Sequence, residues 1–192
     1  MAATDPIAVE GSETRDRIVR VAYDLLLTRS YLGFSFQDVA DRVGIRKASL
    51  YHHFATKEAL GVEVLRRSQR SFERWSSGLA GTPAGQLAAY DEMYRGALRA
   101  GDAICPAGGL AAGWDCIDPA LRDAARSLRQ VQIVWLSGVL GALRPSGAGG
   151  SLADAAAAVF GTCQGAMIAA RITGDAADFE ASLSALKGLY TH

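Results

Sequence analysis

Cysteine is scarce in this chain, and its three cysteines, at positions 105, 116 and 163, are far apart in the sequence. Isolated thiols in odd number do not form a disulfide framework, and their spacing fits no metal-binding motif. The first residues contain no basic stretch followed by an apolar one, so we expect no secretory signal. These absences predict a protein of the reducing cytoplasm that uses no metal or cofactor.

An excess of charge of one sign is also missing, because 20 Lys and Arg residues balance 20 Asp and Glu residues. A chain without an overall positive field can bind nucleic acid only through locally concentrated charge. Long hydrophobic runs are lacking as well. The most apolar segment, 152–170, is mostly alanine and is interrupted by Asp154, Thr162 and Gln164, so we expect no membrane-spanning segment.

Two further absences concern strands and catalysis. No segment alternates polar and apolar residues for long enough to indicate a β-strand. There are no paired carboxylates at useful spacing, no nucleophile motif and no glycine-rich phosphate loop. The sequence therefore predicts an all-α protein that is not an enzyme.

Apolar residues recur instead at the spacing of helical faces. After an expected disordered tail at 1–11, we predict one helix from an N-cap at Ser12 to about Ser30 and a short helix opened by Ser35. A third helix is expected at 47–54, and a fourth from Thr56 to about Ser77. A break at 78–85 should separate these from five more helices, at 86–100, 104–113, 118–143, 151–172 and 176–190.

The second and third of these helices have the features of a helix-turn-helix, whose second helix enters the major groove of DNA. Asp38 follows Ser35 at the spacing of a weak capping box, and Gly44 is placed to end the second helix in the left-handed conformation. Leu50 and Phe54 give the third helix its buried face.

Positive charge is concentrated here, although the whole chain carries no excess. From Arg42 to Lys57 there are four basic residues and no acidic one. The basic stripe is expected to continue along the fourth helix through Arg66, Arg67, Arg70 and Arg74.

The run from Gly33 to Leu60, GFSFQDVADRVGIRKASLYHHFATKEAL, resembles the DNA-binding segment of the TetR family of transcriptional repressors. Its most specific part is Leu-Tyr-His-His-Phe followed by Thr-Lys-Glu-Ala-Leu. The resemblance implies a three-helix DNA-binding module at 12–56 and a helical ligand-binding and dimerisation domain at 57–192, about nine helices in all. It also implies a repressor that binds a palindromic double-stranded DNA operator as a homodimer and is released by a small-molecule effector.

Two kinds of DNA contact are predicted at the matching positions. Four residues are expected to contact DNA phosphates, through a helix N-terminus, the polar end of a side chain or a point charge. They are Ser35, Tyr51, His52 and Lys57. Base edges are expected to be reached from the start of the third helix by Lys47 and Ser49. Arg46 stands where the family usually has Ser or Thr. Because arginine has no acceptor to cap a helix, we expect Arg46 to contact DNA instead.

The second half carries bulky side chains that are predicted to line an apolar ligand pocket, namely Trp75, Tyr90, Met93, Tyr94, Cys105, Trp114, Trp135 and Met167. Such residues at helical spacing are also common in ordinary cores, so we expect at most half of them to touch a ligand. The helix at 151–172 is rich in small residues that allow another backbone to approach. Its expected dimer contacts are Ala157, Phe160, Gly161, Gln164 and Gly165, although the same pattern also suits a helix buried in a monomer core.

Two alternatives to a ligand-released repressor stay open. The segment beginning Cys105-Pro106 resembles a branch of the family that includes cysteine-based sensors of electrophiles or oxidants. Such a thiol has to be exposed and easily ionised, whereas a buried cysteine is inert. The other alternative is a constitutive DNA-binding protein without a ligand. The effector, the operator and the direction of regulation are not determined by the sequence.

Overall fold

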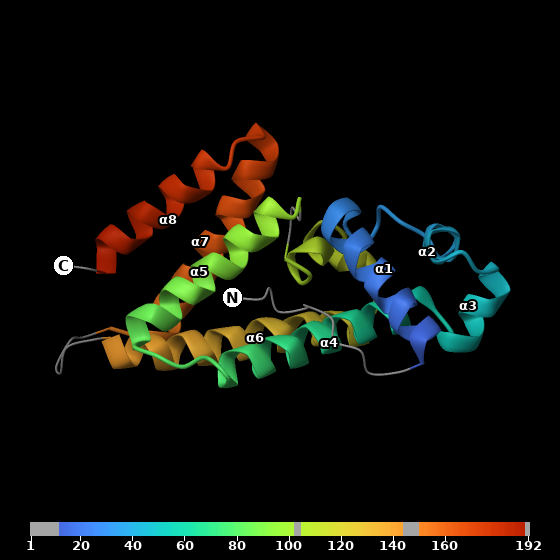
Figure 1. Ribbon diagram of the computed structural model, residues 1–192, viewed down its shortest axis with the longest axis horizontal. Coiled ribbons are helices and arrows are strands. Elements are labelled where there is room, and N and C mark those ends of the chain that lie inside the picture. Colours follow the sequence, from blue (N-terminus) through green and yellow to red (C-terminus); the bar gives the residue numbers. More distant parts are fainter. Residues whose placement is uncertain (1–11, 102–104, 144–149, 191–192) are drawn as a thin grey trace. The chain divides into compact units, whose positions relative to one another are not determined.

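The computed structural model describes residues 12–101, 105–143 and 150–190, without the side chains of 187–190, and every regular element in these ranges is a helix (Figure 1). The elements are α1 (Glu13–Arg29), α2 (Phe36–Val43), α3 (Lys47–His53), α4 (Lys57–Ser77), α5 (Pro83–Arg99), the 3₁₀ helix η1 (Gly108–Cys116), α6 (Pro119–Leu143), α7 (Leu152–Thr173) and α8 (Ala177–Tyr190). The all-α prediction with about nine helices is confirmed. The expected disordered tail at 1–11 lies outside the described residues.

The first two helices begin and end where local chemistry predicts. The Ser12 hydroxyl accepts a hydrogen bond from the Arg15 N–H at the start of α1. Both halves of the capping box between Ser35 and Asp38 are present at the start of α2. Gly44 ends α2 with φ 76° and ψ 35°, the left-handed conformation that glycine adopts at little cost.

Two predicted helix boundaries are wrong. The helix expected at 86–100 begins three residues earlier, because Thr82 caps the N–H of Gly85 and Pro83 occupies the first turn, where its missing N–H costs nothing. The helix expected at 104–113 is instead η1, a 3₁₀ helix at 108–116 with a non-helical Gly113. Periodicity located these segments but could not identify the cap or the tighter winding.

The chain forms two compact units. Unit 1 is drawn from Met1–Trp75 and Ile104–Arg129, and unit 2 from Ser76–Ala103 and Gln130–His192. Unit 1 therefore combines α1–α3 with most of α4, η1 and the first part of α6. The functional boundary expected after residue 56 remains a prediction, because it concerns what the parts do.

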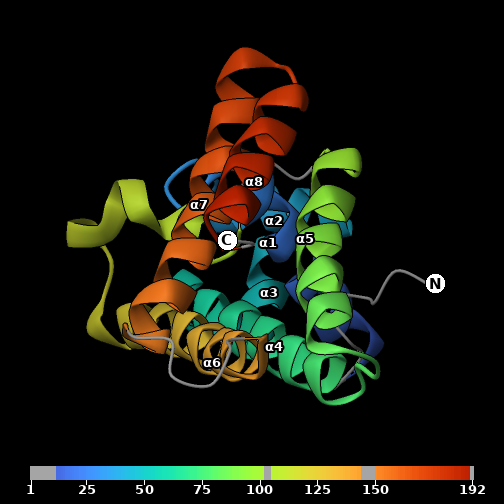
Figure 2. The ribbon, with the colours of Figure 1, turned by 90° about the vertical axis from the view of Figure 1, so that its left-hand side faces the viewer.

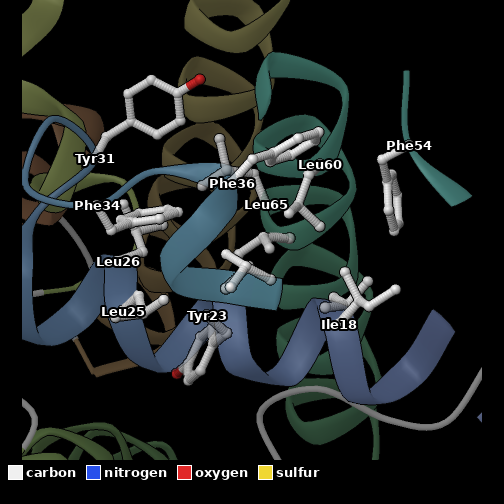
Figure 3. Close-up of a cluster of buried hydrophobic side chains, with 14 of the residues drawn as sticks. Ile18, Tyr23, Leu25, Leu26, Tyr31, Phe34, Phe36, Phe54, Leu60 and Leu65 are labelled. Carbon is white, nitrogen blue, oxygen red and sulfur yellow. The ribbon is translucent and has the colours of Figure 1, made fainter. Parts of the chain in front are cut away.

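The core of unit 1 is one hydrophobic cluster built around α1 (Figure 3). Ile18, Val39 and Leu50 contribute from the three N-terminal helices, and all three are fully buried. Leu60 and Leu65 of α4 join them, and later residues from η1, α6 and the link between them complete the cluster, namely Leu110, Ile117, Leu121, Ala125 and Leu128. The helix-turn-helix thus depends for its core on residues far along the chain.

Unit 2 contains α5, α7 and α8. Helix α7 packs along α8 and also contacts α5 (Figure 2). By length and composition α7 is the helix, among the described residues, that would be able to cross a membrane, a property that core helices of globular proteins share. Eight of its 22 residues are buried, so most of this helix stays accessible in the single chain.

Candidate nucleic-acid interface

The N-terminus of α2 is held by a compact hydrogen-bond network. The Ser35 N–H donates to Asp38 Oδ2 at 2.8 Å, and the Ser35 hydroxyl donates to the same oxygen at 2.6 Å. The Asp38 N–H donates back to Ser35 Oγ at 3.3 Å. These hydrogen bonds from Ser35 lower the pKa of the Asp38 carboxyl. Ser35 itself is exposed, although its hydroxyl hydrogen and its N–H are both donated to Asp38, so a phosphate would have to displace that carboxylate to accept them.

Helix α3 buries one side and exposes the other. Leu50 is fully buried, whereas Arg46, Lys47 and His52 are exposed and Ser49 is half-buried. Tyr51 is 51% exposed although its ring lies edge-on to Phe36, with centroids 5.2 Å apart. The contact with Phe36 holds the Tyr51 ring while about half of the side chain stays exposed.

The start of α3 lacks a side-chain cap, as the sequence predicts. Arg46 occupies the N-cap position with extended backbone and makes no capping hydrogen bond. The C-terminus of α2 is nevertheless fixed, because the Arg17 guanidinium donates to the carbonyl of Val43 at 2.7 Å. Helix α1 thereby braces the turn that leads into α3.

Lys57, expected at the DNA surface, lies half-buried against the connection between α1 and α2. Its ammonium donates to the carbonyls of Tyr31 and Phe34, each at 2.6 Å. The same group sits 4.1 Å from the ring centroid of Tyr31 and 4.4 Å from that of Phe34. Burial lowers the pKa of Lys57, and Glu58 and Asp38 oppose that shift. Two of the three ammonium hydrogens are therefore used within the protein.

The basic stripe expected along α4 is interrupted at Arg67. This side chain is fully buried and donates to Asp16 of α1 at 2.6 Å and to Glu63 at 2.9 Å. Glu63 also accepts from Arg15 at 3.0 Å. Burial alone would raise the pKa of Glu63, but hydrogen bonds from Arg67 and Arg15 lower it overall. Arg67 therefore joins α1 to α4 and does not contribute to a surface.

The residues predicted to line a pocket fall into separate groups. Tyr90, Tyr94 and Trp135 meet inside unit 2, with ring centroids 5.2 Å and 5.6 Å from Tyr90. Their polar partners are two glutamines: Tyr90 donates to Gln132 at 3.0 Å, and Gln164 donates to the Tyr94 hydroxyl at 2.9 Å. Gln132 was not anticipated, although its place one helical turn from Trp135 on α6 was a usable signal.

The remaining predicted pocket residues lie elsewhere. Trp75 stacks at a tilt on Phe72, and Trp114 lies under the Arg126 guanidinium, both within unit 1. Met93 of unit 2 is 37% exposed and Met167 is buried. Cys105 is buried too, which disfavours a role as a sensor thiol.

The five residues predicted at a dimer interface differ in exposure. Gly161 and Gly165 are exposed, and no atom lies within 4 Å of a Cβ added at either. Ala157 and Gln164 are half-buried, and Phe160 is buried. Two further residues of α7, Ile168 and Ile172, are exposed as well and were not predicted at the interface. These exposed residues recur at intervals of three or four and so share one face of α7.

Comparison with known proteins places the N-terminal segment in a family. Residues 18–64 match the family model described as bacterial regulatory proteins, tetR family. The chain is 40% identical over 52 residues to the HTH-type transcriptional repressor KstR2 of Mycolicibacterium smegmatis, a match covering 27% of this chain and 25% of the relative. It is 29% identical over 62 residues to the repressor NemR of Escherichia coli, covering 32% and 31%. The chain thus spans about a quarter to a third of the length of these curated relatives.

Solved structures resemble nearly the whole chain. A TetR-family transcriptional regulator from Agrobacterium tumefaciens is 28% identical with a TM-score of 0.83, and the match covers 91% of this chain and 96% of that one. A TetR transcriptional regulator from Legionella pneumophila is 24% identical with a TM-score of 0.84, covering 94% and 99%. The second likeness is one of fold alone.

Proposed function

This chain belongs to the TetR family of bacterial transcriptional regulators, and from that premise we propose that it is a cytoplasmic repressor that binds double-stranded DNA as a homodimer. Its operator is a palindrome, because two copies of α3 related by a two-fold axis read two equivalent half-sites. A small-molecule effector releases the protein from DNA. The chain itself catalyses no reaction.

The observation that carries this proposal is the surface of α3 and its supports. Arg46, Lys47, Tyr51 and His52 are exposed on a short helix whose opposite face, at Leu50, is locked into the core. Helix α2 braces it, and the N-terminus of α2 presents Ser35 for a phosphate. A helix held from behind, with basic and polar side chains in front and no acidic residue, suits insertion into a major groove.

Homodimer formation is supported by the exposed face of α7. Gly161 and Gly165 allow a second backbone to approach closely, and Ile168 and Ile172 offer apolar side chains on the same face. Apolar side chains exposed at 47% and 78% are costly to leave in water. A two-fold pairing of α7 helices would cover them and bring two DNA-binding modules together.

Effector binding is supported by the aromatic cluster of unit 2. Tyr90 and Tyr94 place their hydroxyls 3.2 Å apart in a buried environment that also holds the amides of Gln132 and Gln164. A few convergent polar groups among aromatic rings are typical of small-molecule sites. The groups that face one another here are uncharged, so the cluster favours a neutral effector with hydrogen-bonding groups.

The test is selection of random DNA duplexes by the full-length protein, followed by fluorescence anisotropy on the enriched sequence. We expect a palindromic site whose binding weakens as salt rises. Lys47→Ala should change the preferred bases, whereas Arg99→Ala, an exposed substitution on α5 of unit 2, should leave the preference unchanged. Recovery of no enriched sequence would refute the proposal.

A screen for compounds that stabilise the protein thermally then tests release. A compound that raises the melting temperature and also lowers operator affinity supports an effector-released repressor. Operator binding that no stabilising compound changes would favour the constitutive DNA-binding protein instead.

A further inference from the structure

The connection between α1 and α2, residues 30–34, adopts an unusual backbone. Ser30 has φ 61° and ψ 169°, a region that is nearly restricted to glycine and costs other residues about 1–3 kcal/mol. Among non-glycine residues in the described ranges, Ser30 alone has a positive φ. Such a conformation persists only where the surroundings impose it, so the contacts that hold this connection are informative.

Lys57 of α4 supplies two of those contacts, and one of them controls Ser35 directly. The carbonyl of Phe34 and the N–H of Ser35 belong to the same planar peptide unit. Lys57 binds the oxygen of this unit at 2.6 Å, and Asp38 binds its N–H at 2.8 Å. The peptide that enters α2 is therefore fixed at both ends, and the orientation of the Ser35 side chain follows from it.

Helix η1 supplies another contact to the same connection. The Tyr31 N–H donates to the carbonyl of Gly109 at 2.9 Å. The approach is close: a Cβ at Gly109 would lie 2.9 Å from the carbonyl oxygen of Leu26, and one at Gly113 would lie 2.7 Å from the Leu32 side chain. The connection thus lies between α4 and η1, both in unit 1, and each bonds the backbone at Tyr31.

We infer that Lys57 is a positioning residue of the DNA-binding module. By holding residues 30–34 it fixes the position of Ser35 and of the N-terminus of α2. Helix η1 holds the same connection through Gly109. This inference rests on the proposed function. It assigns the Lys57 charge to two backbone carbonyls and two aromatic faces inside the protein. This role of Lys57 stands in place of the phosphate contact that the sequence predicts for the same residue.

Salt dependence separates the two roles. A lysine that neutralises a phosphate contributes about 0.9 to the slope of log affinity against log salt, whereas one that acts inside the protein contributes nothing. Lys57→Met keeps the length of the side chain and removes its charge and donors. We expect the full-length variant to bind the selected operator about tenfold more weakly, the equivalent of one charge-assisted hydrogen bond. Its slope should equal that of the wild type.

Lys47→Met is the matched control, because Lys47 is an exposed lysine on α3. Its slope should fall, by up to about 0.9, because even a lysine that reaches a base edge brings its charge between the phosphates that line the groove. Combining Lys57→Met with Ser35→Ala should cost less than the two single effects added together, because Lys57 acts through Ser35. A purely structural lysine would give additive effects on the affinity of the folded protein.

Gly109→Ala tests the same connection even if Lys57→Met does not fold. Its added methyl displaces η1 from Leu26, and we expect weaker operator binding with an unchanged slope. Gly96→Ala, where no atom lies within 4 Å of the new Cβ, is its control and should bind as the wild type does.

A slope reduced by about 0.9 in Lys57→Met, or unchanged operator affinity in Gly109→Ala, would overturn the inference while the proposed function stands. If the wild-type protein bound no duplex, the proposed function would fail and this inference would fall with it.

Discussion

Arg67 is the largest side chain that is completely buried among the described residues, and it lies between two acidic groups. Asp16 reaches it from α1, and Glu63 reaches it from one turn earlier on α4. Arg15 and Arg70 also reach Glu63, so three arginines surround two carboxylates. Removing a guanidinium from water is costly, and the arrangement is stable only while both carboxylates stay in place.

Asp16→Asn should therefore destabilise the fold strongly. Removing one partner of a buried ion pair typically costs about 3–5 kcal/mol, and we expect the lower end of that range because Glu63 still faces Arg67. Chemical denaturation measures the change in the free energy of unfolding. Asp123→Asn is the control, because Asp123 and Arg126 form an ion pair with side chains 70% and 61% exposed. Its effect should be below about 1 kcal/mol, and equal effects of the two substitutions would contradict this account.

At the level of residues, sequence patterns distinguish apolar faces better than they place charges. The exposed and buried sides of α3 follow directly from Leu50 and Phe54. Arg67, however, lies at helical spacing from Leu60 and Val64, on the buried stripe of α4, and this register was the available signal for its burial. Lys57 carried no comparable signal, because the carbonyls it binds belong to residues between helices.

Among the elements, α3 is an α-helix whose start has no side-chain cap. Its N-cap, Arg46, makes no side-chain hydrogen bond to the helix. Arg46→Ser would supply the missing acceptor and should raise the free energy of unfolding by about 1 kcal/mol. Operator binding should weaken, with a salt slope smaller by about 0.9, because the substitution also removes a charge from the DNA surface.

Denaturation and anisotropy at several salt concentrations measure the two effects. Arg42→Ser, within α2, offers no cap and should not stabilise the protein. Unchanged affinity and slope in Arg46→Ser would show that Arg46 does not contact DNA.

Element boundaries were predictable where a side chain marks them and not elsewhere. Ser12, Ser35 and Gly44 carry unambiguous cap or stop chemistry, and the helices begin or end at them. The pair Thr82–Pro83 carries the same kind of signal, although its proline also suits the break predicted at 78–85. The winding of η1 is set by its packing on α1, which no local pattern of glycine and alanine reveals.

At the scale of the whole molecule, the proposed dimer makes a direct prediction. Ile172, on the exposed face of α7, is 78% exposed. Ile172→Glu places a charge where apolar contact is proposed, so the protein should sediment as a monomer. Operator affinity should fall about a hundredfold, because two linked modules bind far more tightly than one.

Val134→Glu is the matched control, since Val134 is 61% exposed on a different helix, α6. It should leave both the sedimentation and the operator affinity unchanged. A dimer that persists in Ile172→Glu would exclude this face of α7 as the interface.

The fold class and the helix-turn-helix were accessible from the sequence because both depend on local periodicity and a specific motif. The division into units was not. Residues 105–129 join the N-terminal helices through packing between segments distant in sequence, and hydrophobic spacing alone does not say which faces meet.

The interleaved composition of unit 1 has a consequence for biosynthesis. A ribosome releases α1, α2 and α3 long before it has made Leu110, Leu121 and Leu128, which complete their core. The nascent helix-turn-helix therefore keeps part of its apolar surface uncovered until η1 and the first half of α6 have been made.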